Sequence, residues 1–353
     1  MKNSRKRLAV LISLLLAALI AMSAFAGCKP GNGSDPKAEA TGVPTEAPTE
    51  DPSAPKPLAH WKLQNVEGCY TGSVDDDTVG FKDLTGNGND LIAKIAGNGD
   101  QLDIFSWDND VDASVAKFTS ALRIDNTKTK AASVDPYNAS ETSYTGGYTS
   151  GKYLETVKGA PLNSFEFPDG FSVEVIFKLS PELDNEYNRY TGIFSRQGVI
   201  EDQNEPPFSI ALTEWDNDAS GTIGANKTWL QLLIMNDVAR LNEEMDATLL
   251  GADTWYHVLV TVSDGKAQVY LNGKLLFEAW TAFSSIYCTD PDYSWEVGVG
   301  RKWGGDHSAD SKNENAPEGM IRRLFAGSVA EIRVFGQAIS VDESLYATVF
   351  AQE

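Results

Sequence analysis

Cysteine and histidine are scarce in this chain, which has three of each in 353 residues. His60, His257 and His307 show no metal-ligand spacing such as H-E-x-x-H, which argues against a catalytic zinc site. The sequence also lacks a G-x-x-x-x-G-K-[ST] phosphate loop and a G-x-S-x-G nucleophile elbow. Three common classes of enzyme site therefore have no signature here.

Basic residues are also few, since 29 Lys and Arg stand against 50 Asp and Glu, for a net charge of -21 at pH 7. Such a surface repels nucleic acid and anionic membrane lipid. It suits divalent cations or neutral ligands, although the same charge would also serve solubility alone.

Long hydrophobic runs are limited to one, from Leu8 to Phe25, which follows the basic segment Lys2–Arg7. Together with Ala26-Gly27-Cys28 it has the pattern of a secretory signal, predicted to span residues 1–27. The sequence FAGC resembles a bacterial lipobox, which implies that Cys28 becomes the lipidated first residue of the mature protein. The alternative is an uncleaved membrane anchor, for which this run is short. Both alternatives place the body outside the cytoplasmic membrane.

Aromatic residues are absent from Lys29 to Pro57, where Pro, Thr, Glu, Gly and Ala dominate. Such a composition cannot bury enough apolar surface to offset the entropy lost on ordering. Residues 28–57 are therefore predicted to be a disordered, semi-extended spacer between the anchor and the folded body.

The remaining residues, 58–353, are interpreted as one all-β domain, because strand patterns separated by Gly, Asn and Asp recur along them. Two stretches without sustained periodicity, near 126–161 and 300–323, read as long loop insertions. Cys69 and Cys288 fall within this domain, and in an exported chain they could form a disulfide, although spacing alone does not show that they are close.

The stretch from Gly251 to Trp280 has the clearest alternation in the chain. Val258, Val260 and Val262 fall on one face of a strand, and His257, Leu259 and Thr261 fall on the other, which is expected to be wetter. Asp264-Gly265 and Asn272-Gly273 separate the runs, and Asn-Gly suits a type I′ turn because both central residues must tolerate positive φ. Three consecutive antiparallel strands are predicted.

Several motifs resemble those of the laminin-G-like, concanavalin A-like lectin/glucanase superfamily. They are W-Y-H-V-x-V-T-V-x-D-G-x-x-x-x-Y-x-N-G from Trp255, the TGNGND loop from Thr85, FSVEVIFKL from Phe171, and FAGSVAEIRVF from Phe325. The capping box S-x-x-E at Ser340 also fits the family's ending and predicts a short C-terminal helix. The resemblance implies a jelly-roll sandwich of two antiparallel sheets. It leaves function open, because this fold carries lectins, glycosidases and adhesion domains alike.

The same resemblance implies a structural calcium ion beside the TGNGND loop. Calcium binds six to eight oxygen atoms, and Asp83, Asn89 and Glu331 are the candidate donors. However, Ala330 stands where the family usually has Asp, which weakens the expectation.

A glycosidase would need two facing carboxylates. The family's catalytic pattern resembles E-h-D-x-x-E on one strand, and the nearest run here, Glu214 to Asp218, lacks the second Glu. Glu174 stands alone between Val173 and Val175. Catalysis is therefore the weaker hypothesis.

Carbohydrate binding is the leading hypothesis, since sugar rings stack on Trp and Tyr while short polar side chains bind the hydroxyls. Three predicted loop clusters have this composition: Trp215 with Asp216 and Asn217, Tyr187 with Arg189, and Trp303 with Asp306 and His307. Each aromatic residue could instead pack against the sandwich. A protein-binding adhesion module and a divergent glycoside hydrolase remain as alternatives. The former would show a flat apolar patch instead of exposed aromatics among polar groups.

Overall fold

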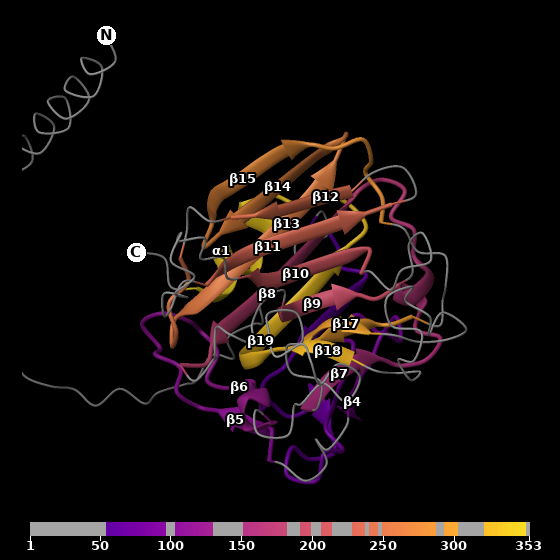
Figure 1. Cartoon of the computed structure of the whole chain (residues 1–353). Coiled ribbons are helices and arrows are strands. Elements are labelled where there is room, and N and C mark those ends of the chain that lie inside the picture. Colours follow the sequence, from indigo (N-terminus) through magenta and orange to yellow (C-terminus); the bar gives the residue numbers. More distant parts are fainter. Residues whose placement is uncertain are drawn as a thin grey trace, which may run out of the picture. The chain divides into compact units, whose positions relative to one another are not determined.

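A computed structural model of the chain describes residues 54–96, 103–129, 151–181, 191–198, 206–213, 228–236, 240–245, 249–286, 293–302 and 321–350 (Figure 1). These residues belong to one compact unit, Asp51–Glu353. The predicted signal and most of the predicted spacer lie outside the described residues. Within the described ranges, no helix is both long and apolar enough to cross a membrane.

Two large antiparallel sheets form the unit, as the resemblance implied (Figure 1). The eight-stranded sheet has the order β15 (Lys274–Trp280), β14 (Lys266–Leu271), β13 (Trp255–Ser263), β8 (Phe171–Leu179), β19 (Ala326–Phe335), β6 (Ala121–Asp125) and β5 (Phe105–Asp108), while β1 (Ala59–Lys62) pairs with the second half of β19. The nine-stranded sheet has the order β12 (Arg240–Glu244), β11 (Trp229–Met235), β10 (Phe208–Thr213), β9 (Thr191–Arg196), β16 (Trp295–Val297), β7 (Gly151–Thr156), β4 (Leu91–Ala96), β3 (Gly80–Phe81) and β2 (Tyr70–Thr71).

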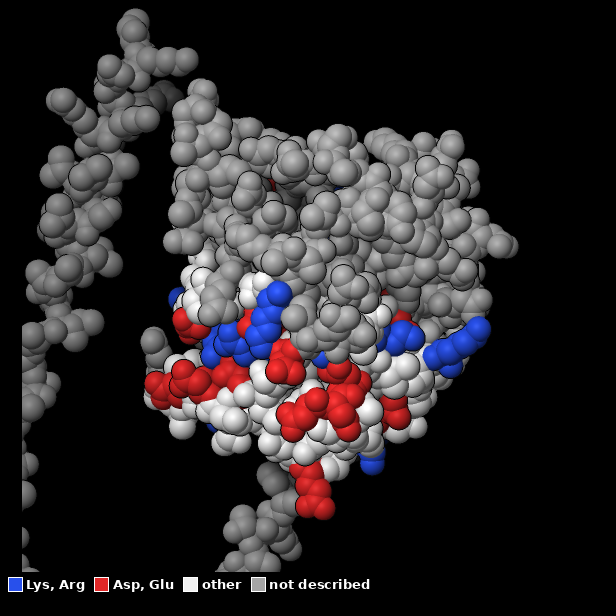
Figure 2. Space-filling view, turned by 60° about the horizontal axis from the view of Figure 1, so that its bottom comes forward, with Lys and Arg blue, Asp and Glu red and all other residues white. Residues whose placement is uncertain are grey.

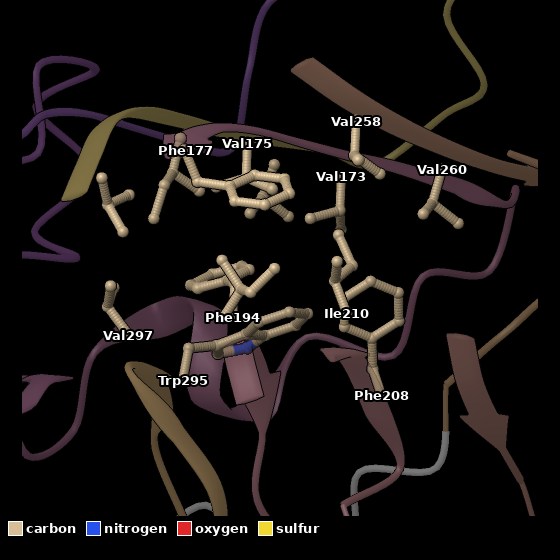
Figure 3. Close-up of a cluster of buried hydrophobic side chains, with 14 of the residues drawn as sticks. Val173, Val175, Phe177, Phe194, Phe208, Ile210, Val258, Val260, Trp295 and Val297 are labelled. Atoms are coloured by element: carbon tan, nitrogen blue, oxygen red, sulfur yellow. The ribbon is translucent and has the colours of Figure 1, made fainter. Parts of the chain in front are cut away.

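The main hydrophobic core lies between the two sheets, where side chains from both inner faces meet (Figure 3). Val173, Val175 and Phe177 of β8 face the core together with Val258 and Val260 of β13. The opposing sheet contributes Phe194, Phe208, Ile210, Trp295 and Val297. Burial of each such side chain stabilises the fold by about 1.5–3 kcal/mol. The alternation seen in the sequence therefore sets which face of each strand points inward.

The predicted meander is confirmed as β13, β14 and β15, paired in sequence. Asn272 and Gly273 have φ of 48° and 72°, so both central residues of the second turn are left-handed, as a type I′ turn requires. The capping box at Ser340 is also present, and it begins η6 (Val341–Glu343), which α1 (Leu345–Val349) follows. The short C-terminal helix is thus confirmed.

Part of the predicted insertion near 126–161 is not a loop. Gly151–Thr156 forms β7, which lies inside the nine-stranded sheet between β16 and β4. The stretch begins with a short 3-10 helix, η2 (Asn126–Thr129), and a second one, η3 (Pro161–Ser164), starts at its last residue. The ends of the stretch 300–323 belong to β17 (Val299–Lys302) and β18 (Ile321–Leu324), which pair with each other.

The outer face of the eight-stranded sheet is less exposed to solvent than the alternation predicted. His257 and Leu259 are both fully buried there, because the C-terminal segment covers them. Leu259 packs with Phe335 and Ile339, and the ring of Tyr346 lies 6.0 Å from that of His257. The side of β13 predicted to be wet is therefore a second packing face.

A buried carboxylate holds this cover in place. Glu174 on β8 has no exposed surface, and its Oε2 lies 2.7 Å from His257 Nε2 and accepts a hydrogen bond of 2.7 Å from the Leu345 amide. Its Oε1 accepts hydrogen bonds from the Arg333 guanidinium, which also donates to the Glu343 carbonyl. Burial alone would raise the pKa of Glu174, but the hydrogen bond with His257 and the charge of Arg333 lower it overall. The charged form is thus favoured in the fold.

Replacing Glu174 with Gln removes the charge and leaves Arg333 without its carboxylate partner. We expect the free energy of unfolding, measured by urea titration at pH 7, to fall by about 3–5 kcal/mol, as for other buried pairs that lose one member. The matched control is Glu278→Gln, which breaks an exposed ion pair and should leave stability nearly unchanged.

The pH dependence of this loss follows from the lowered pKa. The Glu174 carboxylate stabilises the fold above its ordinary pKa of 4.5, and this stability disappears as the pH falls through the lower folded value. The difference in the free energy of unfolding between the wild type and Glu174→Gln should therefore become smaller as the pH falls below 4.5. A difference that stayed constant over this pH range would contradict the conclusion that Glu174 stabilises the fold in its charged form.

Candidate functional site

The predicted aromatic clusters cannot be placed. Trp215, Asp216, Asn217, Tyr187, Arg189, Trp303, Asp306 and His307 all lie outside the described residues, as do Cys28 and Cys288. Cys69 is described, and it is a buried free thiol whose pKa is raised mainly by burial. The structure thus shows one of the two cysteines as unbridged and leaves the other outside the described part.

The predicted calcium donor Asp83 is engaged by the protein itself. Its Oδ1 accepts hydrogen bonds from the His60 amide and from both the amide and the hydroxyl of Thr85. Its Oδ2 accepts two more, from the amide and the side chain of Asn89. A carboxylate has about four lone-pair positions, so five donors leave none directed at an ion. The carboxylate organises the TGNGND loop directly.

Asn89 and Glu331 are engaged in the same way. The side-chain oxygen of Asn89 accepts from the Leu162 amide at 2.8 Å. Glu331 binds His60 through Oε1 at 2.7 Å and Gln64 through Oε2 at 3.2 Å. Within the described ranges, no group of three or more His, Cys, Asp or Glu could hold a metal ion. The three predicted donors therefore do not fit a calcium ion in this arrangement.

The surroundings of Ala330 account for the residue at the position where the resemblance led us to expect Asp. A β-bulge in β19 opposite β8 falls at this residue, and its side chain is fully buried with Phe118, Trp255 and Leu345. An Asp side chain would be buried there among apolar groups, which is costly without a partner. The small apolar side chain of Ala330 therefore matches its surroundings.

Two carboxylates that the sequence analysis did not identify are cross-strand partners. Glu155 on β7 and Glu296 on β16 oppose each other on the outer face of the nine-stranded sheet. Glu155 forms an ion pair of 3.0 Å with Lys94, and Glu296, which is fully buried, accepts a hydrogen bond of 2.9 Å from Ser294. Ion-paired and buried, these groups are not arranged like an accessible acid and nucleophile. Of the acids that the sequence analysis considered for catalysis, Glu174 is committed to its own buried network, and the run from Glu214 to Asp218 lies outside the described residues.

A different residue stands out on the surface. Trp280, the last residue of β15, is 80% exposed, more than any other large hydrophobic residue in the described part of the chain. Exposed tryptophan is unusual, because burial of its large side chain would be favourable. β15 is the outermost strand of its sheet and lies at the top of Figure 1. The residue therefore sits on an open edge of the sandwich.

Polar side chains lie on the same face of the hairpin as this ring, and the strand register places them. Lys266 is the cross-strand partner of Trp280, and its Nζ lies 5.9 Å from the centre of the indole ring. Glu278, two residues before Trp280, forms an ion pair of 2.7 Å with Lys266 and accepts a hydrogen bond of 2.8 Å from Gln268. We call Trp280, Lys266, Gln268 and Glu278 the Trp280 platform.

The platform rests on a well-held hairpin. On the opposite face of β14, Ala267 and Val269 are buried in the main core. Next to Trp280, the Thr281 amide donates to the Gly265 carbonyl at 2.6 Å, and the Gly265 amide donates to the Ser284 hydroxyl at 3.1 Å. These contacts hold the backbone that carries the ring, so a ligand would not have to order the hairpin on binding.

Acidic side chains are prominent on the described surface, where red carboxylates gather at one end of the molecule with blue basic residues beside them (Figure 2). This fits the net charge of -21. The net charge of the whole chain favours neutral or cationic ligands over polyanions.

Comparison with known proteins finds no matching family model and no matching curated protein. Among solved structures, domain 4 of AbnA, a GH43 extracellular arabinanase from Geobacillus stearothermophilus, in complex with arabinotriose, aligns over 82% of this chain and 97% of its own, with 15% identity and a TM-score of 0.42. The CBM40 of the Ruminococcus gnavus IT-sialidase aligns over 58% and 94%, with 13% identity and a TM-score of 0.38. The binding domain of botulinum neurotoxin serotype D aligns over 83% and 51%, with 13% identity and a TM-score of 0.41. These similarities are too distant to assign a family.

Because hydrogen bonds already satisfy the TGNGND loop, we expect neither EDTA nor added calcium to change Tm in thermal unfolding. Replacing Asp83 with Asn should lower the stability by about 1–3 kcal/mol in both conditions, since some of the five donors lose their acceptor. A Tm that rises with calcium in the wild type, and not in Asp83→Asn, would show that an ion binds here after all.

Proposed function

We propose that the protein binds carbohydrate through the Trp280 platform, without catalysis. The observation that carries the proposal is the 80% exposed indole ring, with Lys266, Gln268 and Glu278 beside it. The flat C–H face of a sugar ring stacks on such a surface, while side chains of this kind bind its hydroxyls. Two of the similar solved structures are a carbohydrate-binding domain and a domain with a bound sugar. Their similarity to this chain is too remote to support the proposal.

A protein-binding module is less well supported by the described residues. Their exposed large hydrophobic side chains are spread over several strands and loops, and only Leu275 shares a strand with Trp280. An adhesion surface would instead require a contiguous apolar patch of several hundred Å². Within the described part of the chain, single apolar residues among polar ones favour a glycan.

Binding to an array of neutral and acidic glycans tests the proposal. We expect Trp280→Ala to lose about tenfold in affinity for the best ligand, since an aromatic stacking contact contributes on that order. Trp280→Phe should retain part of the affinity, because it keeps an aromatic face. The matched control is Leu249→Ala, which removes another exposed apolar side chain away from the platform. Equal binding by wild type and Trp280→Ala would exclude this site.

We further propose that the protein is held at a bacterial surface by a lipid on Cys28, as the FAGC sequence supports. A lipid anchor would present the binding body to extracellular polysaccharide through the spacer. Metabolic labelling with a fatty-acid analogue should mark the wild type in the membrane fraction and not Cys28→Ser. Labelling of both proteins alike would contradict the proposal.

A further inference from the structure

We propose that the Trp280 platform selects uncharged glycans, and that Glu278 sets this selection by neutralising Lys266. This inference rests on the proposed function, because it specifies which sugars the platform accepts. It assigns different roles to two neighbouring residues, the indole ring for affinity and the carboxylate for discrimination.

Lys266 would by itself favour acidic sugars. Its ammonium group lies 5.9 Å from the centre of the indole ring, close enough to reach a carboxylate on a sugar stacked there. The platform would then resemble a uronate site, with one aromatic face and one cation. The identity of its partner therefore decides the class of ligand.

Glu278 removes that preference. Its Oε2 lies 2.7 Å from Lys266 Nζ, so the two charges cancel beside the ring. The hydrogen bond from Lys266 and then that from Gln268 lower the pKa of Glu278, so the carboxylate remains ionised at neutral pH. An acidic sugar would meet this carboxylate at the same place where it needs the cation. A neutral sugar meets no such repulsion.

The remaining groups of the platform suit hydroxyls. Lys266 has three N–H donors and uses one toward Glu278. Gln268 donates one amide N–H to Glu278, so it can offer its carbonyl oxygen and its second N–H to a ligand. The residues on the next strand in register with Lys266 and Gln268 are Ser263 and Thr261, which carry no charge. Among the residues that the strand register places beside Trp280, the one cation, Lys266, is paired with the one anion, Glu278. The exposed Asp264 in the adjoining turn adds a second carboxylate, which would also repel an acidic sugar.

The test compares neutral xylohexaose and cellohexaose with acidic hexagalacturonate, by affinity electrophoresis and calorimetry at low ionic strength, where charge effects are largest. The wild type should bind at least one neutral probe more tightly than the acidic one. Glu278→Gln should gain about tenfold for hexagalacturonate, a factor within reach of one repulsive contact, and keep its affinity for the neutral probe. The matched control is Glu67→Gln, which removes one exposed negative charge elsewhere and should gain nothing.

The outcomes separate the two proposals. A wild type that prefers hexagalacturonate, with binding lost in Trp280→Ala, would overturn the selection by Glu278 and leave the platform standing. Equal gains in Glu278→Gln and Glu67→Gln would also overturn it, because net charge alone would then explain the effect. A wild type that binds none of the probes, or binds them as well as Trp280→Ala does, would overturn the platform and with it the inference.

Discussion

Burial of β8 on both faces is the constraint on which the rest of the structure depends. All nine of its residues are buried, although their side chains point alternately to opposite sides of the sheet. The inner side chains meet those of the second sheet, while the outer side holds Glu174 beneath the C-terminal segment. β8 pairs with β19 on one side and β13 on the other, so the position of the hairpin that carries Trp280 follows from this strand. A substitution that displaces β8 would therefore disturb both the core and the platform.

The alternation of apolar residues was sufficient to predict the three strands between Gly251 and Trp280, since it reports one buried face and one different face for each of them. It could not predict what covers the second face. His257 and Leu259 look like residues of a wet surface until a segment about 80 residues later in the chain folds over them. The same limit explains β7, whose short pattern at Gly151–Thr156 follows a long polar stretch and pairs with strands distant in sequence. Pairing partners of this kind leave no local signal.

The platform was missed for a related reason. Trp280 ends an apolar strand, where a large aromatic residue would usually belong to the core. A signal was nevertheless present, because Trp280 and Glu278 share one parity of β15, and the turn places them opposite the polar residues Lys266 and Gln268 of β14. The alternation says which side of the strand a residue faces. Exposure depends also on β15 being the last strand of its sheet, beyond which the described part of the chain places no further strand. The loop clusters predicted from composition alone lie outside the described residues. Composition thus pointed to loops, whereas the alternation along a strand would have pointed to Trp280.

An exposed outer strand presents unpaired backbone groups that could recruit another chain, which gives the charges of β15 a second effect. Lys274 and Glu278 are exposed along that strand, and charged side chains oppose pairing with a second copy. A carboxylate that discourages strand addition and also neutralises Lys266 would serve solubility and selectivity with one side chain. The Trp280 ring can remain uncovered under these conditions, because the groups beside it keep water bound and offer a second protein no continuous apolar contact. A sugar ring needs only the small apolar face that remains.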